Sequence, residues 1–278
     1  MKKLILSKLF GKREKILKSY KIHDRDLLNR LITKNRHTLS TIENWLPEEV
    51  AARSYFNYGV PPQIKDLINL DVGSEMTYTD LIAYFSRHFA SINYLELGVS
   101  IGKNFLQLSN VLKESKMTGF DIENINPVLE SHFNFDSQII WDTIESSIRK
   151  EKSSARTYHD VNQNRIKYLA ADIWDESSWS KLKGEKFNII FSDALHDPKA
   201  LLWEFDMIKK YGLLDTQFMF LWDDLNHGLE NSFFEIAQQL RDARGKSVDV
   251  YFFKVNGWLG KNYPLQHDIG IVSNIKLS

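Results

Sequence analysis

The feature that most constrains the fold is an alternation of apolar runs and amphipathic segments from residue 93 onward. Five runs each lead into a helical segment, and two more follow near the end of the chain: residues 94–97, 117–122, 166–172, 187–193, 218–224, 248–253 and 268–272. Strands that alternate with helices are typical of a parallel sheet covered by helices on both faces. We therefore predict an α/β, doubly wound, mostly parallel seven-stranded sheet that closes with an antiparallel hairpin.

The first 90 residues differ in character, because their apolar residues have helical spacing and none of their runs reads as a strand. We expect an N-terminal helical appendage over residues 1–90 and the α/β domain over residues 91–278. One helix of the appendage should begin within residues 77–80, with Thr79 as its N-cap. Residues 124–164 are longer than a simple crossover needs, and we interpret them as an insertion or a cover.

The composition narrows the class of protein. Hydrophobic residues make up 43% of the 278 residues, which is enough for a real core. Basic and acidic residues number 36 each, so the zero net charge argues against a broad nucleic-acid surface, and no nucleic-acid partner is expected. Cysteine is absent, which excludes disulfides, cysteine metal ligands and a cysteine nucleophile. The N-terminal apolar run is too short and too charged for a membrane span, and we expect a cytoplasmic protein.

A turn with two glycines lies at the start of the α/β part. Residues 94–97 read as a buried strand that breaks at Gly98 and continues as a helix after Gly102. Glycine permits the tight bend and lets a ligand approach the backbone, while the helix start offers unpaired N–H groups. Only two of the three glycines of a dinucleotide fingerprint are present. The segment is therefore either a loop that binds another nucleotide cofactor or an ordinary strand-to-helix turn.

Acidic side chains stand at or next to the ends of four successive strand-like runs. They are Asp121, Asp172, Asp193 and the pair Asp223-Asp224. Each one alone is more often a capping or turn residue. In open α/β sheets, however, ligands bind beyond the carboxyl ends of the strands, so this recurrence places several carboxylates along one edge.

The order of these motifs resembles the class I S-adenosylmethionine (SAM)-dependent methyltransferases over about residues 93–273. The pattern E-x-G-x-x-x-G, from Glu96 to Gly102, is similar to their cofactor loop. The resemblance implies a Rossmann-like fold, SAM as the cofactor, and a loop in which Gly98 lets the methionine end approach the main chain. It implies that Asp121, or less favourably Glu123, accepts hydrogen bonds from the ribose hydroxyls. It further implies that Asp172 contacts adenine and that Glu96 anchors the loop or the amino group of the ligand.

A subgroup is suggested by Asp193 together with Asp223 and Asp224 at the next strand end. This set resembles the metal site of macrocin-type and catechol-type O-methyltransferases. The resemblance implies Mg²⁺ or a similar divalent cation, which hard oxygen ligands favour, bound next to the acceptor hydroxyls. Alternatively, Asp223 and Asp224 only cap the following helix. Leu195 is a departure, because sugar O-methyltransferases of this type often carry a second acid at its position.

The candidate general base is His196, which follows Asp193 closely in a loop that should face the same cleft. An imidazole with a pKa near neutrality suits the deprotonation of an acceptor hydroxyl. The alternative is that His196 only shapes the turn before Pro198. His227 and His267 are the other candidates near this edge.

From the resemblance we expect methyl transfer from SAM to an oxygen of a small-molecule acceptor, such as a sugar or another natural product. Two rivals remain open: a metal-independent methyltransferase, and a non-catalytic cofactor-binding or scaffold protein. The N-terminal helices are a candidate surface for homo-oligomer formation.

Overall fold

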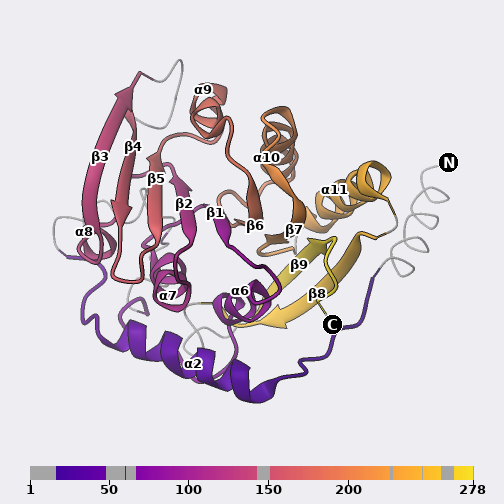
Figure 1. Cartoon of the computed structure of the whole chain (residues 1–278), viewed down its shortest axis with the longest axis horizontal. Helices are drawn as coiled ribbons and strands as arrows, with labels where there is room; N and C mark the ends of the chain where they lie inside the picture. Colours follow the sequence, from indigo (N-terminus) through magenta and orange to yellow (C-terminus); the bar gives the residue numbers. More distant parts are fainter. Residues whose placement is uncertain are drawn as a thin grey trace.

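A mixed nine-stranded sheet forms the centre of the computed structural model, in the order β3-β4-β5-β2-β1-β6-β7-β9-β8 (Figure 1). Its five central strands, β5, β2, β1, β6 and β7, run parallel, which confirms the expected α/β core. The strands are β1 (Asn93–Leu97), β2 (Lys116–Asp121), β3 (Asn134–Trp141), β4 (Ser153–His159), β5 (Arg165–Ala170), β6 (Phe187–Ser192), β7 (Leu214–Trp222), β8 (Asp249–Val255) and β9 (His267–Ser273).

The structure describes residues 17–47, 60, 67–142, 151–225, 228–245, 247–257 and 266–277. The basic N-terminal segment and His227 lie outside these ranges. Within them, no helix combines the length and the apolar character needed to cross a membrane.

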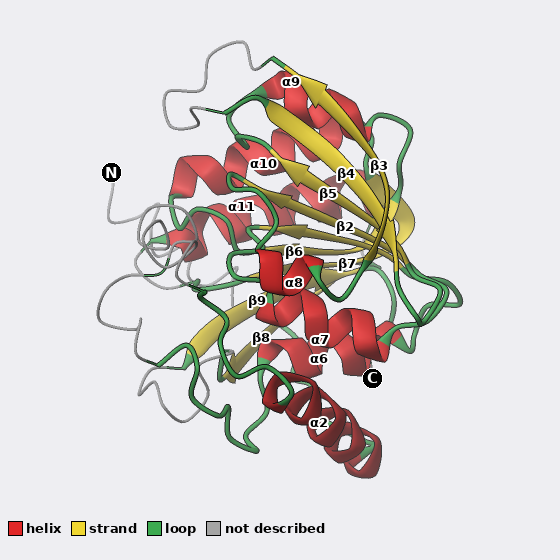
Figure 2. Ribbon diagram, turned by 90° about the vertical axis from the view of Figure 1, so that its left-hand side faces the viewer, coloured by secondary structure: helices red, strands yellow, loops and turns green. Residues whose placement is uncertain are grey.

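Helices cover both faces of the sheet (Figure 2). On one face lie α9 (Glu176–Trp179), the 3₁₀ turn η1 (Ser180–Leu182), α10 (Pro198–Lys210) and α11 (Leu229–Arg244). On the other lie α6 (Tyr78–Ser86) and α7 (Lys103–Val111), with α2 (Arg25–Ser40) packed outside them; the short α8 (Pro127–Glu130) precedes β3.

The alternation of side chains along β1 shows how the two faces are filled. Tyr94 joins the buried cluster that also contains the apolar residues of α2, α6 and α7. Its neighbours Leu95 and Leu97 belong to the cluster beneath α10 and α11. Successive strand residues point to opposite faces, so each central strand contributes to both layers of core. The N-terminal helices therefore share a core with the sheet.

The predicted number of seven strands is wrong for the described residues. The segment expected to be an insertion supplies β3 and β4, which extend the sheet by antiparallel pairing onto β5. Ala155 and Tyr158 of β4 are buried although most of the strand is polar, so the apolar alternation that marks a strand was weak here. At the opposite edge, β9 lies between β7 and β8 and is antiparallel to both.

The expected N-cap of α6 is also wrong. Thr77, and not Thr79, caps the helix, and it forms a capping box with Asp80. A capping box needs an acid or amide three residues after the cap, and Asp80 meets that spacing only for Thr77.

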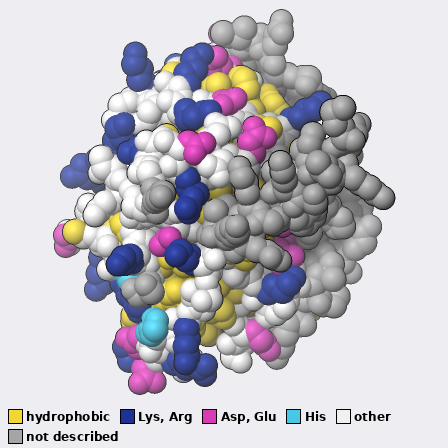
Figure 3. Space-filling view, turned by 90° about the vertical axis from the view of Figure 1, so that its right-hand side faces the viewer, with side chains coloured by type: hydrophobic (Ala, Val, Ile, Leu, Met, Phe, Trp, Pro, Cys, Tyr) yellow, Lys and Arg dark blue, Asp and Glu magenta, His cyan; other side chains and the backbone are white. Residues whose placement is uncertain are grey.

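Charged side chains are mixed on the surface. On the face shown in Figure 3, basic and acidic side chains are interspersed among uncharged ones, as the zero net charge of the chain leads one to expect.

Candidate active site

The carboxyl ends of the parallel strands bring the predicted residues to one edge of the sheet. Leu97 of β1 is in register with Phe120 of β2 on one side and with Ser192 of β6 on the other. Ser192 is in register with Trp222 of β7. The residues that follow these positions, from Gly98 to the Asp223-Asp224 pair, therefore share one rim.

Gly98 adopts a backbone conformation that excludes other residues. Its φ is +82°, and a Cβ added there would lie 2.3 Å from the carbonyl oxygen of Asp193 and 2.5 Å from Cα of Ala194. Glycine is thus required for the close approach of the β1–α7 loop to the β6–α10 loop. Gly102, with φ +93°, is the N-cap of α7 and packs directly against the side chain of Leu129.

Asp121 holds the glycine loop in place. Its Oδ2 accepts hydrogen bonds from the amides of Val99 and Ser100, both at 2.8 Å, and its Oδ1 accepts from the amide of Glu123 at 2.8 Å. An ionised carboxylate offers about four lone-pair positions, so one such side chain can accept from several donors at once.

A cavity of about 150 Å³ opens beside this loop. Its lining combines apolar side chains with two carboxylates: Gly98, Phe120, Asp121, Ile122, Asp172, Ile173, Trp174, Ala194 and Leu195. The ends of β1, β2, β5 and β6 all contribute to it. Asp172 is fixed at its rim, where Oδ1 accepts from the amide of Trp174 at 2.9 Å.

Glu96 is buried beneath the loop rather than exposed to the cavity. Its Oε2 accepts a hydrogen bond from the Tyr94 hydroxyl at 2.7 Å, and that hydroxyl in turn accepts from the side-chain amide of Asn104. Burial raises the pKa of Glu96 to about 8, and the nearby charges of Asp193 and Asp121 contribute to the rise, against the effect of its hydrogen bonds. Glu96 therefore holds a proton readily near neutral pH.

Carboxylates and histidines form a cluster at the ends of β6 and β7. Asp193, His196 and Asp223 have ligand atoms within 4.8 Å of one another, and so do Asp223, Asp224 and His267. The predicted metal set is thus divided between two groups that share Asp223, and each group includes a histidine.

The contacts of the two histidines are close. His196 Nε2 lies 3.1 Å from Asp193 Oδ1, and its Nδ1 lies 3.5 Å from Asp224 Oδ2. His267 Nδ1 lies 2.8 Å and 2.9 Å from the two oxygens of Asp223 and 3.1 Å from Asp224 Oδ1. Because an ionised carboxylate only accepts hydrogen bonds, Nδ1 of His267 acts as the donor toward Asp223.

The charges of this cluster shift the pKa values of its members. Burial and the charge of Asp223 raise the pKa of Asp193 to about 7. Burial lowers the pKa of His196, but the hydrogen bond to Asp193 and the surrounding carboxylates outweigh it and raise that pKa to about 9. For His267 the same balance, with Asp223 and Asp224, raises the pKa to about 11. Without a cation, both imidazoles are protonated at neutral pH, which is not the form of a general base.

Two residues near the cluster were not predicted from the sequence. Tyr78 of α6 packs its ring at 5.5 Å from the ring of His267 and at 5.0 Å from that of Phe191. Glu204 of α10 is fully buried, and its Oε2 accepts from the Ser192 hydroxyl at 2.6 Å. Glu204 could have been found, because it stands on the apolar face that Leu201 and Phe205 define.

No protein-family model and no curated protein matches the chain. Among solved structures, the O-methyltransferase from Bacillus cereus in complex with SAH is 13% identical, covers 91% of this chain and 92% of that chain, and has a TM-score of 0.42. The O-methyltransferase TomG from Streptomyces achromogenes, in complex with SAM, is 10% identical, covers 88% of this chain and 96% of that chain, and has a TM-score of 0.44. MycE from the mycinamycin pathway, in complex with Mg and SAH, is 14% identical, covers 57% of this chain and 41% of that chain, and has a TM-score of 0.36. At these values the similarity is distant, and it assigns neither a substrate nor a metal to this chain.

Proposed function

We propose that this protein is a SAM-dependent methyltransferase that acts on an oxygen of a small-molecule acceptor, such as a sugar or another natural product. One observation carries the proposal: the β6–α10 loop lines the cavity with Ala194 and Leu195 and also supplies Asp193 and His196 to the polar cluster. A cavity at the glycine loop therefore adjoins a group of side chains suited to hold a hydroxylated acceptor.

The residues of the cavity fit the chemical parts of SAM. Phe120, Ile122 and Ile173 offer apolar surface for a purine, and Asp172 also lines the cavity. We assign the ribose hydroxyls to Asp121, because its carboxylate lines the cavity and a carboxylate accepts hydrogen bonds from hydroxyl groups. The glycine loop faces the methionine end, and Glu96 fixes the strand that leads into it. When bound, SAM supplies the methyl group through its sulfonium; the task of the protein is then to orient the acceptor and exclude water.

The carboxylates of Asp193, Asp223 and Asp224 fit a divalent cation such as Mg²⁺. The donor set is rich in hard oxygen atoms, and Asp223 belongs to both groups of ligand atoms that lie within 4.8 Å of one another, one with Asp193 and one with Asp224. When bound, the cation would supply Lewis acidity to an acceptor hydroxyl. His196 lies between Asp193 and Asp224, where an imidazole can take up or release the proton of that hydroxyl.

A metal-independent methyltransferase is a second candidate, and the two histidines favour it. Protonated His196 and His267 offset two of the three carboxylate charges, so repulsion within the cluster is reduced without a cation. In this case the cluster would bind the acceptor through hydrogen bonds alone.

Calorimetry with SAM and its demethylated product tests the proposal. The wild type should bind both, and Asp121→Ala should weaken binding by about 1–3 kcal/mol through the lost hydrogen bonds. Asp136→Ala, a change to an exposed acid on β3, is the matched control and should leave the affinity unchanged. A folded wild type that binds neither compound would rule the proposal out.

Thermal unfolding with divalent cations separates the two candidates. If a cation binds, the melting temperature should rise with its concentration, because ligands that bind only the folded state stabilise it. Replacing both Asp223 and Asp224 by asparagine should abolish the rise. If Mg²⁺, Mn²⁺ and a chelator change neither the melting temperature nor the turnover of the wild type, the protein is the metal-independent enzyme.

A further inference from the structure

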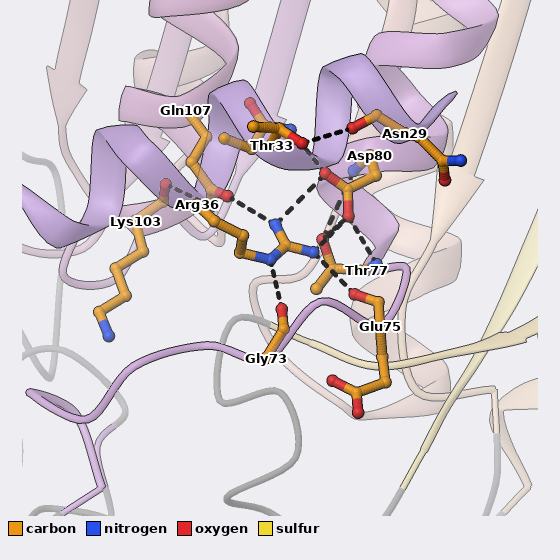
Figure 4. A network of polar contacts seen from close by, with 10 residues as sticks. Asn29, Thr33, Arg36, Gly73, Glu75, Thr77, Asp80, Lys103 and Gln107 are labelled. Carbon is orange, nitrogen blue, oxygen red and sulfur yellow. Dashed lines mark hydrogen bonds and ion pairs between the residues drawn. The ribbon is translucent and has the colours of Figure 1, made fainter. Parts of the chain in front are cut away.

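The N-terminal helix α2 is tied to the start of α6 by one buried ion pair. Arg36 of α2 donates to Asp80 of α6, with Nη2 2.5 Å from Oδ2, and the two side chains are 14% and 0% exposed (Figure 4). The same guanidinium donates to the carbonyl oxygens of Gly73 and Glu75, both at 2.7 Å, and to Gln107 of α7 at 3.3 Å. Arg36 thus joins α2, α6, α7 and the loop before α6 at a single point.

Asp80, which Arg36 holds, also fixes the first residues of α6. Its Oδ2 accepts from the backbone amide and the hydroxyl of Thr77, at 2.8 Å and 3.0 Å. The next residue, Tyr78, donates its amide to the carbonyl oxygen of Asn256 at 3.1 Å, just beyond the end of β8. The position of Tyr78 is therefore set from two sides, by the capping box and by this contact.

Tyr78 in turn confines His267. The two rings meet edge to face, with their centroids 5.5 Å apart. On another side of the imidazole, Nε2 lies so close to Gly257 that an added Cβ there would come within 2.5 Å of it. Enclosed in this way, the ring presents Nδ1 to the carboxylates of Asp223 and Asp224.

We propose that Arg36 is a positioning residue for the carboxylate–histidine cluster, acting through Asp80 and Tyr78 on the orientation of His267. The N-terminal helix is then a working part of the site and not an appendage to it. This inference rests on the proposed function only in regarding the cluster as the active centre. The contacts from Arg36 to His267 involve neither a cofactor nor a cation.

The test is nuclear magnetic resonance of the full-length protein with ¹⁵N-labelled histidine side chains. Among the eight histidines, His267 is assigned by its loss in His267→Gln. In the wild type, Nδ1–H of His267 should give a downfield signal that exchanges slowly with water, because the side chain is only 17% exposed and this nitrogen donates to a carboxylate. Arg36→Gln should speed its exchange by about tenfold or remove it, and Arg36→Lys should not rescue it, because one ammonium cannot replace the guanidinium fork.

The control is Arg156→Gln, because Arg156 of β4 also forms an ion pair between two elements, with Glu130 of α8 at 2.9 Å, although this pair is more exposed. It should leave the signal unchanged. If the Arg36 variants do not fold, Tyr78→Leu against Tyr78→Phe decides, since only the aromatic ring should preserve the signal. The proposal is overturned if folded Arg36→Gln keeps the wild-type signal, or if Tyr78→Leu keeps it where the Arg36 variants do not fold. It is also overturned if the wild type itself lacks this signal. An independent readout is the affinity for Mn²⁺. If the wild type binds Mn²⁺, Arg36→Gln should bind it about tenfold more weakly, because residues that orient metal ligands contribute to metal affinity.

Discussion

At the scale of single residues, Glu96 shows what burial does to a carboxyl group. It is 1% exposed, and two negatively charged neighbours add to the cost of ionising it. Its pKa in the folded protein, about 8, lies above the ordinary 4.5. The folded state therefore holds this proton more tightly than the unfolded state. The resulting stabilisation is complete below pH 4.5 and is lost as the pH rises through 8.

Glu96→Gln should remove this dependence on pH. Glutamine keeps an oxygen that accepts from the Tyr94 hydroxyl, so the core contact survives. We expect urea titrations to show that the free energy of unfolding of the wild type falls as the pH rises from 4.5 through 8. This fall should exceed that of the variant by on the order of 2–4 kcal/mol, because only the wild type has a glutamate that ionises. Glu235→Gln, at an exposed position of α11, should behave as the wild type. Parallel profiles for wild type and Glu96→Gln would contradict the pKa assigned to Glu96.

Two glycines separate backbone strain from close approach. Gly98 and Gly184 have similar positive φ values, +82° and +92°, but only Gly98 has backbone atoms where a Cβ would stand. Gly184→Ala should cost about 1–2 kcal/mol, because only the left-handed conformation is strained. Gly98→Ala should cost more than about 3 kcal/mol and disturb the cofactor loop. Denaturant unfolding measures both changes, and equal costs would show that the approach of the two loops is not rigid.

At the scale of elements, the start of α6 matters because it delivers both Asp80 and Tyr78 to their partners. Thr77 accepts from and donates to Asp80, whereas the buried Oγ1 of Thr79 has no hydrogen-bond partner among the described residues. We therefore expect the two threonine hydroxyls to have opposite effects on stability, although they stand two positions apart.

The pair Thr77→Val and Thr79→Val tests this difference. Valine has the shape of threonine, so each change removes only the hydroxyl. Thr77→Val should lower the free energy of unfolding by about 1–2 kcal/mol through the lost cap. Thr79→Val should be neutral or stabilising, because burying an unpaired hydroxyl is unfavourable. Thermal or chemical unfolding decides, and a larger loss in Thr79→Val would contradict the observed cap.

At the scale of the whole molecule, the sheet ends at β3 in an edge with unusual apolar exposure. Phe135, Ile139 and Ile140 are 57%, 65% and 57% exposed on this strand. Edge strands expose unpaired backbone groups, and natural proteins commonly protect them with charges. Among the described residues, Asp136 and a register shift between Phe135 and Ser137 lie near the start of β3, and the Asp142–Lys152 ion pair lies just past its end, so the charges flank the strand and leave Ile139 and Ile140 apolar.

Ile139→Lys should reduce the aggregation of the protein on storage, measured by light scattering, because a charge on the edge opposes pairing with another chain. Its free energy of unfolding should stay within about 0.5 kcal/mol of the wild type, since the side chain is exposed. Val161→Lys, at a residue 86% exposed in a turn, is the control and should not change aggregation. Equal aggregation of all three proteins would show that the protein does not aggregate through the β3 edge.

The sequence by itself determined the parallel core and the residues at its carboxyl edge. Apolar runs that alternate with amphipathic helices permit few other folds, and a residue that follows a strand is placed by the strand. Gly98, Asp121, Asp172, Asp193 and the Asp223-Asp224 pair therefore came to one rim. β3 and β4 escaped prediction because their polar side chains and partial burial leave little alternation.

Only the tertiary structure decided how the site is assembled. His267 reaches Asp223 across 44 residues, and Arg36 reaches Asp80 across another 44, so no local pattern announces either pair. The pKa values of Glu96 and His196 likewise depend on burial and on charges from several strands, which exist only once the sheet has formed. Local sequence periodicity fixes elements, whereas ionisation and the confinement of a ring depend on neighbours distant in the chain.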